Sequence, residues 1–474
     1  RSTLREQDVD PNAWTMVSVV ETPREDDDRF VWQEGGPSAY RELMGSSLDG
    51  PFWRVRFATF ADSVRVEERA EEYRVHLSPA SDHAEVVHKL PEAAAGDSLA
   101  EPTARAIADS VVQARYGHDP ASLKRVGAEP SARPNRRDWT FTYADTTGYP
   151  LDRGEARIQV ELAGSEVTDA STFIRVPESW ERESRRRETP MQIVGIICGL
   201  LAALLLLGGA VAAIVYWARG SFRRRPFFVV AGGGFLVVLL GVLNGWPGTV
   251  AGFDTAQPFF NQVILFLLGG LVAGAFASGA MGLIAGFVHD RIGPNEPTPL
   301  VRSVAAGLGL GVLGGGLLSI AGTVGPSLSP PWADYGALDA ALPWVVPVFA
   351  RFLPFLALTI ALLLAAVVLH RWTQAGKRRV IAALGSAVGL GFVVAGIGPA
   401  ETVTTWAAQG GTLGVFLAAS VRLVWRYDRA LVPMMAAGFV GLRAVGAATT
   451  AAYSAAAVGE VFAAGLILAV AVWW

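Results

Sequence analysis

The sequence predicts an α+β domain followed by an all-α bundle of about nine transmembrane helices, because its two parts have the compositions of two different solvents. Up to Pro190 the chain is rich in Asp, Glu, Arg and turn residues. Beyond Met191, charged residues form only short clusters between long runs of Leu, Val, Ala, Gly and Phe. We therefore assign residues 1–180 to an extracytoplasmic domain, 181–190 to a stalk and 191–474 to a multi-pass helical domain.

Nine apolar runs in the second part are candidates for membrane spans. A helix needs about 20 apolar residues to cross the roughly 30 Å of hydrocarbon in a bilayer. The runs are residues 191–217, 227–243, 259–288, 301–324, 344–370, 380–397, 412–423 with part of the preceding connection, 431–450 and 458–474. The lipid bilayer is thus the first partner that the sequence predicts.

Positive charges predict the orientation of these helices. They fall on alternate connections, in residues 218–226, 289–302, 371–379 and 422–430. The intervening connections carry no Lys or Arg: residues 244–257, 325–342, 398–411 and 451–457. Because Lys and Arg are enriched in cytoplasmic loops, the first helix is expected to run from outside to inside. This predicts a protein of the bacterial inner membrane with residues 1–190 on its extracytoplasmic side.

The two ends of the sequence suggest a longer protein. The chain opens on the charged run 1–10, without the apolar core of a signal peptide, and it closes on Val472, Trp473 and Trp474. An exported domain needs a targeting segment, so we expect a removed signal or an anchor helix before Arg1. We also expect further residues after Trp474.

Alternating apolar and polar residues predict strands in the soluble part. These strands are residues 15–20, 52–60, 72–77, 139–143, 156–162 and 166–176. Residues 98–116 read as an amphipathic helix, and residues 38–44 as a shorter one. The pattern predicts an antiparallel sheet with helices packed on one face, built from two related halves. A helix over residues 178–188 is expected to reach the first span, with an interruption near Pro190.

Charge and cysteine content exclude several classes of function. The formal net charge of −3 gives no basic surface for nucleic acid, so no nucleic-acid partner is predicted. The single cysteine, Cys198, allows no disulfide framework within the chain and reads as a packing residue in lipid. The sequence predicts no cofactor.

Three neighbouring histidines were weighed as a zinc site. His76, His83 and His88 lie close together with acidic residues between them. The five-residue spacing from His83 to His88 fits neither one face of a helix nor one face of a strand, and no HExxH motif is present. Solvated histidines are therefore favoured over a metal site, and we predict no metal.

Few ionisable residues lie within the apolar runs, and we expect them to pair. Arg443 is the deepest, and Glu460 begins the following helix from the outer side, so these two are predicted to form an ion pair. Arg351 and Glu401 are predicted to pair near the outer surface. A structural role is favoured over a substrate site for both pairs. No serine–histidine dyad or paired aspartates appear within the spans, so no catalytic residue is predicted.

Glycines recur at four-residue spacing within the runs and predict close helix packing. They are Gly270 and Gly274, Gly282 and Gly286, Gly307, Gly311 and Gly315, and Gly385 and Gly389.

Several segments carry a resemblance to a protease family. They are GEARIQVELAGSEVTDASTFIRVPESWERE at 154–183, FWRVRFATF at 52–60, the helix at 98–112, and AETVTTWAAQGGTLGVFLAASVRLVWRYDRALVP at 400–433. Together they resemble the PepSY-like outer domain and the membrane region of large bacterial CPBP-family intramembrane endopeptidases. The resemblance implies a family motif of two glutamates, three residues and an arginine, with membrane histidines that activate water. This chain lacks that motif, since Glu67–Glu68 and Glu71–Glu72 lie in the soluble part without the arginine.

Three functions remain open. In the first, the chain is the sensing and scaffold part of a CPBP-like endopeptidase, and the catalytic motif is not in this chain. Alternatively, it is a non-enzymatic membrane protein whose outer domain binds a peptide, an envelope component or a partner subunit and whose bundle serves as anchor, regulator or complex subunit. A transporter is the third reading, and it requires a polar cavity near the midplane lined by Arg443 and Glu460. The sequence does not reveal a substrate or an oligomeric state.

Overall fold

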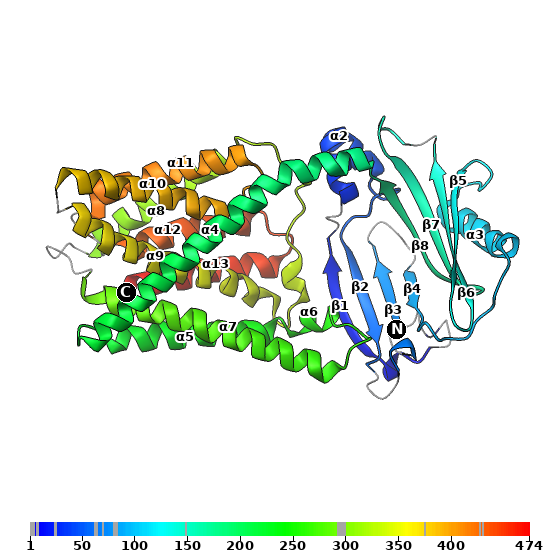
Figure 1. Cartoon of the computed structure of the whole chain (residues 1–474), viewed down its shortest axis with the longest axis horizontal. Helices are drawn as coiled ribbons and strands as arrows, with labels where there is room; N and C mark the ends of the chain where they lie inside the picture. Colours follow the sequence, from blue (N-terminus) through cyan, green and yellow to red (C-terminus); the bar gives the residue numbers. More distant parts are fainter. Residues whose placement is uncertain are drawn as a thin grey trace. The chain divides into compact units, whose positions relative to one another are not determined.

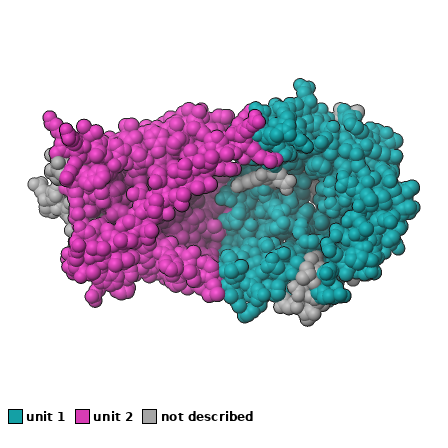
Figure 2. All heavy atoms as spheres, in the orientation of Figure 1, with its two compact units in different colours: residues 1–183, 245–266, 328–341 teal, residues 184–244, 267–327, 342–474 magenta. Residues whose placement is uncertain are grey.

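The chain forms two compact units in a computed structural model (Figures 1 and 2). Unit 1 comprises Arg1–Glu183, Gly245–Phe266 and Leu328–Ala341, and unit 2 comprises Ser184–Asn244, Leu267–Ser327 and Leu342–Trp474. The structure describes residues 5, 9–22, 26–60, 65–68, 71–78, 84–146, 149–291, 300–373, 376–425, 428 and 431–474. Two connections that the sequence analysis assigned to the helical domain thus belong to unit 1.

Unit 1 contains two four-stranded antiparallel sheets, each with its strands in sequence order. The first sheet is β1 (Thr15–Glu21), β2 (Phe52–Ala58), β3 (Glu72–Leu77) and β4 (Glu85–Lys89). The second sheet is β5 (Lys124–Ala132), β6 (Arg137–Asp145), β7 (Glu155–Ala163) and β8 (Glu166–Arg175). The predicted α+β class and all six predicted strands are confirmed, while β4 and β5 were missed.

Two helices cover one face of the second sheet. Helix α3 (Glu101–Tyr116) buries Ala104, Ala108 and Val112, which lie four residues apart and therefore on one side of the helix. These small side chains pack against the buried residues of β6 and β7. Helix α2 (Asp26–Leu43) packs against the other end of the same face and against Trp180. The predicted helix at 98–116 is confirmed.

Helix α2 is longer than the predicted 38–44. It continues across a kink at Gly36 and Pro37, where the sequence indicates a helix boundary. Gly36 adopts a positive φ of 67° immediately before Pro37, and this glycine–proline pair normally ends a helix. The predicted repeat is only partly visible. In the first half a strand precedes the helix and pairs back onto β2, whereas in the second half the helix precedes all four strands.

Unit 2 is formed by helices, and the described residues contain nine that are long and apolar enough to cross a membrane. These are α4 (Glu178–Ala218), α5 (Arg224–Asn244), α7 (Phe259–Val288), α8 (Leu300–Gly322), α9 (Val346–Thr373), α10 (Lys377–Ile397), α11 (Val403–Ser420), α12 (Leu431–Thr449) and α13 (Ser454–Trp473). Large apolar side chains such as Phe276 (77% exposed) and Val301 (79% exposed) point outward. Such a surface suits hydrocarbon, and the predicted multi-pass membrane architecture is confirmed at this level.

Two boundaries differ from those predicted. Helix α4 continues through Pro190 without an interruption, so the expected stalk is part of one 41-residue helix that begins in unit 1. Helix α11 begins at Val403 and not near Thr412, because Thr402 caps it by accepting a hydrogen bond from the Thr405 amide. The first half of α11 contains Thr, Gln and Gly residues, which lower its hydrophobicity and are typical of a connection.

Glycines bring several helices into close contact. A Cβ atom at Gly311 of α8 would lie 2.7 Å from the Phe439 amide nitrogen of α12, and one at Gly282 of α7 would lie 2.8 Å from the Phe227 carbonyl oxygen of α5. The predicted role is wrong for Gly385 and Gly389, because a Cβ atom at either position would have no described atom of another helix within 4 Å.

Candidate functional site

A buried arginine joins the first sheet to the connection between α5 and α7. This connection contains the short helix α6 (Trp246–Ala251) and belongs to unit 1. Arg56 of β2 donates hydrogen bonds from Nη1 to the carbonyl oxygens of Ala251 (2.9 Å) and Phe253 (2.6 Å). Its Nε donates to Glu72 Oε2 at 2.7 Å. We call Arg56, Glu72 and Arg74 the anchor cluster.

Glu72 is the centre of the anchor cluster. It is fully buried on β3 and also pairs with Arg74. Burial acts to raise the pKa of the Glu72 carboxyl, but the charges and hydrogen bonds of Arg74 and Arg56 outweigh burial and lower that pKa below 4.5. A carboxylate held in this way stays ionised and fixes both arginines. Arg56 therefore remains oriented toward the α6 connection.

The connection between α8 and α9 is bonded to unit 1 as well. Asp339, in the 3-10 turn η4 (Gly336–Asp339), accepts a hydrogen bond from the Val20 amide of β1 at 2.8 Å. Trp332 Nε1 donates to the Tyr40 hydroxyl of α2 at 3.0 Å, and Gln33 donates to the Leu328 carbonyl at 2.9 Å. Two helix connections are thus integral parts of the unit that carries the sheets.

His88 links the two sheets where the edge strands β4 and β8 approach one another. It is 8% exposed and stacks on Tyr73, with ring centroids 3.9 Å apart. Its Nδ1 lies 2.6 Å from Glu166 Oε1 of β8, and its Nε2 lies 3.3 Å from Glu71 Oε1. Burial opposes the charged ring, but both carboxylates outweigh it and raise the pKa of His88 above 6.5. His88 therefore bridges the sheets, and its two carboxylate partners favour the charged form of the ring.

The histidines do not form a metal site in the described residues. His76 and Tyr73 are three residues apart on β3, so His76 lies on the opposite face of the sheet from His88, whose register partner is Tyr73. Burial, with the charges of Arg54 and Arg74, lowers the pKa of His76 to about 4. No group of three or more His, Cys, Asp or Glu side chains suited to a metal occurs among the described residues, and His83 lies outside them. The expectation of solvated histidines is wrong for the buried His88.

A third polar cluster lies beside this junction. Arg115, in the last turn of α3, pairs with Glu85 of β4. Burial raises the pKa of the Glu85 carboxyl, and the Arg115 charge only partly offsets this. Burial and the Glu161 charge likewise raise the pKa of Asp169 on β8. Partly exposed polar groups of both signs therefore meet where the two sheets adjoin.

In unit 2, the predicted intramembrane charges combine differently from expectation. Arg351 of α9 forms a bidentate ion pair with Glu460 of α13, with Nη2–Oε1 at 2.7 Å and Nε–Oε2 at 2.9 Å. Glu460 was expected to pair with Arg443, and Arg351 with Glu401. The starts of α9 and α13 pack together, since a Cβ atom at Gly459 would lie 3.0 Å from Pro347. Because the two helix starts are in contact, Arg351 is the arginine that pairs with Glu460.

Arg443 contacts an aromatic ring instead. Its Cζ lies 5.0 Å from the centroid of Phe439, one turn earlier on α12. Among the described residues, no carboxylate forms an ion pair with Arg443. No ion pair between Glu401 and Arg351 is formed, because both oxygens of Glu460 already face the Arg351 guanidinium.

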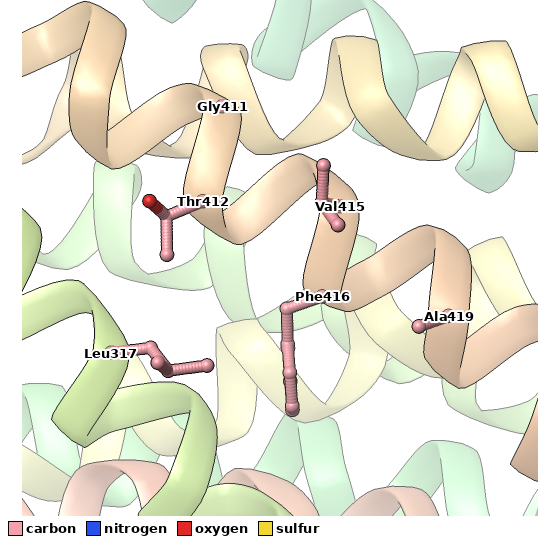
Figure 3. A pocket seen from close by; sticks show the side chains of 6 residues that line it. All are labelled: Leu317, Gly411, Thr412, Val415, Phe416 and Ala419. Atoms are coloured by element: carbon pink, nitrogen blue, oxygen red, sulfur yellow. The ribbon is translucent and has the colours of Figure 1, made fainter.

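An apolar groove lies between α8 and α11 (Figure 3). Its volume is about 580 Å³, and its lining residues are Leu317, Gly411, Thr412, Val415, Phe416 and Ala419. Thr412 alone among these carries a polar side chain. The groove suits an apolar chain and offers no group for proton transfer or metal binding.

Sequence reasoning missed the anchor cluster and the His88 bridge. A signal for the first was present, because Arg54 and Arg56 alternate on one strand while Glu72 and Arg74 alternate on another. Such spacing places charges on one face of each strand. The pairing of β2 with β3, which brings Arg56 beside Arg74, is not visible in either segment alone.

Comparison with known proteins adds no assignment: no protein-family model, no curated protein and no solved structure matches the chain. The fold and the clusters above define its class. It is a multi-pass helical membrane protein with an α+β unit that incorporates two of the helix connections.

His88 makes the stability of unit 1 depend on pH. Because its folded pKa is raised, its stabilising effect is complete below the unfolded value of 6.5 and is lost as the pH rises through the folded value. We expect His88→Gln to lower the apparent unfolding temperature by several degrees at about pH 6, corresponding to about 1.5–3 kcal/mol, and by less at about pH 9. Thermal unfolding of the full chain in detergent measures this.

His76→Gln provides a control of opposite sign. The lowered pKa of His76 means that its stabilising effect is present above 6.5 and is lost as the pH falls toward 4. The difference between wild type and His76→Gln should therefore shrink at low pH. If both variants shifted with the same slope, the His88 bridge would not be a charged one.

The Arg351–Glu460 pair should matter for the folding of the bundle. Glu460→Gln leaves the Arg351 guanidinium in a low-dielectric site with a neutral partner, and we expect a loss of about 2–4 kcal/mol. The double variant Arg351→Gln/Glu460→Gln should lose less than the sum of the two single variants. Thermal unfolding in detergent checks this, and strict additivity would contradict a direct pair.

Proposed function

We propose that this chain is a membrane-embedded sensing and scaffold protein, whose outer α+β unit binds a peptide or protein and passes the binding event to its helices. The observation that carries the proposal is the construction of unit 1 from three parts of the chain. The connection joining α5 to α7 and the one joining α8 to α9 are bonded into the same unit as the sheets. A change in the sheets therefore acts on the ends of four helices.

The anchor cluster suits such a relay because it joins the first sheet to the α6 connection through several direct hydrogen bonds. Arg56 is 7% exposed, and it bonds Glu72 on one side and two carbonyls of the α6 connection on the other. Buried, charge-assisted hydrogen bonds are short and directional, so displacement of β2 or β3 displaces the connection. Figure 1 allows β1, β2 and α6 to be followed within this unit.

Charge distribution supports an extracytoplasmic position for unit 1. The two connections bonded to the sheets are among those without Lys or Arg, whereas the arginine-rich connections belong to unit 2. By the positive-inside tendency, connections without positive charge face outward, and the sheets share their side of the membrane. The inner membrane of a bacterium is the proposed location.

The polar groups beside β4 and β8 favour a peptide or protein as the ligand. Glu85, Arg115 and Asp169 offer both signs of charge within one partly exposed region. Groups of this kind recognise the backbone and charged side chains of a peptide. The resemblance to CPBP proteins makes a specific form of the proposal, in which the bound peptide regulates a protease core whose Glu-Glu motif is not among the residues of this chain. A downstream reading frame with the Glu-Glu motif would support that form, and a stop codon directly after Trp474 would remove it.

The orientation can be tested with single cysteines. Cys198 is the single cysteine of the sequence, so Cys198→Ala gives a background without thiols. Ser131→Cys places a thiol on the exposed strand β5, and Ser221→Cys places one in the exposed arginine-rich connection after α4. We expect a membrane-impermeant maleimide to label Ser131→Cys in intact cells and Ser221→Cys only after lysis. The reverse pattern would refute the proposed orientation.

The relay can be tested by weakening the anchor cluster. In Arg56→Gln, two carbonyls of the α6 connection lose a charged donor, which we expect to cost about 2–3 kcal/mol. Hydrogen exchange on the chain in nanodiscs should show roughly hundredfold lower protection in residues 245–258, extending into the first turns of α7. Arg65→Gln, at an exposed arginine paired only with Glu68, is the matched control and should change neither region. Faster exchange confined to β2 and β3 would contradict a relay.

A further inference from the structure

Three helices of unit 2 carry charged side chains at one depth. Arg351 lies five residues after Val346, the first residue of α9, and Glu460 lies six residues after Ser454, the first residue of α13. Arg443 lies six residues before Thr449, the last residue of α12. Since α12 runs antiparallel to the other two, all three positions are about 7–9 Å from the same end of the bundle. We call them the charge layer.

The charge layer carries an excess positive charge. The bidentate contact between Arg351 and Glu460 neutralises one arginine, and Arg443 remains. Within the described spans, Arg443 has the Phe439 ring beside it and no carboxylate partner. A ring face contributes about 0.5–2 kcal/mol, which is less than the cost of a charged arginine in hydrocarbon. The layer is therefore electrostatically incomplete within the described spans.

Arg443 lies on an open face of α12. The first half of this helix is buried almost completely, from Leu431 to Val440, whereas Arg443 is exposed. Val445 is 55% exposed, and no described atom of another helix lies within 4 Å of a Cβ atom placed at Gly446. An exposed arginine next to an uncovered glycine leaves room for a second helix at close range.

We propose that this face binds a transmembrane helix of a partner protein that carries an aspartate or glutamate at the depth of Arg443. Charge complementarity argues for a carboxylate, because one more negative charge completes the charge layer. The direction of the side chain argues against a lipid headgroup. Arg443 packs on Phe439, one turn further from the helix end at Thr449, and so extends away from the nearer membrane surface.

The helix length supports the same choice of partner. Helix α12 has 19 residues and spans about 28 Å, which barely matches the hydrocarbon thickness, so its end lies close to the hydrocarbon boundary. A phosphate group lies beyond that boundary, whereas a carboxylate on a neighbouring helix lies at the required depth. This inference concerns unit 2 and does not depend on what the sheets of unit 1 bind.

A designed probe helix tests the inference on the full chain. The probe is a single-span Leu/Ala helix with one glutamate six residues from the end that matches Thr449; a second probe has glutamine at that site. The chain carries a fluorophore at Ser221→Cys in the Cys198→Ala background, and energy transfer to the labelled probe is measured in phosphatidylcholine vesicles. We expect the glutamate probe to bind about tenfold more tightly than the glutamine probe.

The dependence on Arg443 completes the test. Arg443→Gln should remove the preference for glutamate, and Arg443→Lys should keep most of it. The comparison of the two probes on the unaltered chain needs no folded variant, so it stands even if Arg443→Gln unfolds. Equal binding of both probes would overturn the proposal. It would also be overturned if phosphatidylglycerol in the vesicles abolished the glutamate preference, since a lipid headgroup would then be the natural partner of Arg443.

Discussion

The absence of water in hydrocarbon is the constraint on which the rest of the structure depends. Backbone polar groups cannot be left unpaired there, so each span of unit 2 is a helix that satisfies its own hydrogen bonds. The connections between helices satisfy only part of their hydrogen bonding in this way, as where the Gly252 amide donates to the Thr249 carbonyl. In two of them, groups of unit 1 supply the partners: Arg56 for Ala251 and Phe253, and the Val20 amide for Asp339. Two connections thus complete their hydrogen bonding within the α+β unit, whereas the spans complete theirs internally.

The spans were predictable because their signal is local, whereas the missed strands lack one. About 20 consecutive apolar residues identify a membrane helix without any knowledge of its neighbours. Strand β4 has only five residues, and β5 contains Gly127 and Pro130 and is largely exposed, so neither shows a strong alternation. Both are edge strands of their sheets, where one side has no ladder partner and such residues are tolerated. These two segments form strands because of their positions in the sheets, and the residues of each segment alone do not indicate those positions.

The charged sites divide in the same way. Depth within a span follows from counting residues, and counting places Arg351, Arg443 and Glu460 near one level. Which residue faces Glu460 depends on the packing and rotation of three helices, and sequence reasoning chose Arg443 because α12 is adjacent in the chain. The close approach at Gly459 brings α9 nearer to the glutamate instead. The His88 bridge was out of reach for a similar reason, since Glu166 is 78 residues away and belongs to the other sheet.

The anchor cluster and the charge layer have the same composition, two arginines and one glutamate, but not the same environment. In the anchor cluster, Arg56 also donates hydrogen bonds to two carbonyl oxygens, and the Arg74 side chain is 36% exposed. Carbonyl dipoles and water thereby stabilise the excess positive charge, and the cluster is complete by itself. In the charge layer, the excess charge rests on Arg443, for which the described residues supply only an aromatic ring. Two clusters with equal charge therefore differ in what they lack: the one among the sheets needs no further ligand, and the one among the spans needs an anion.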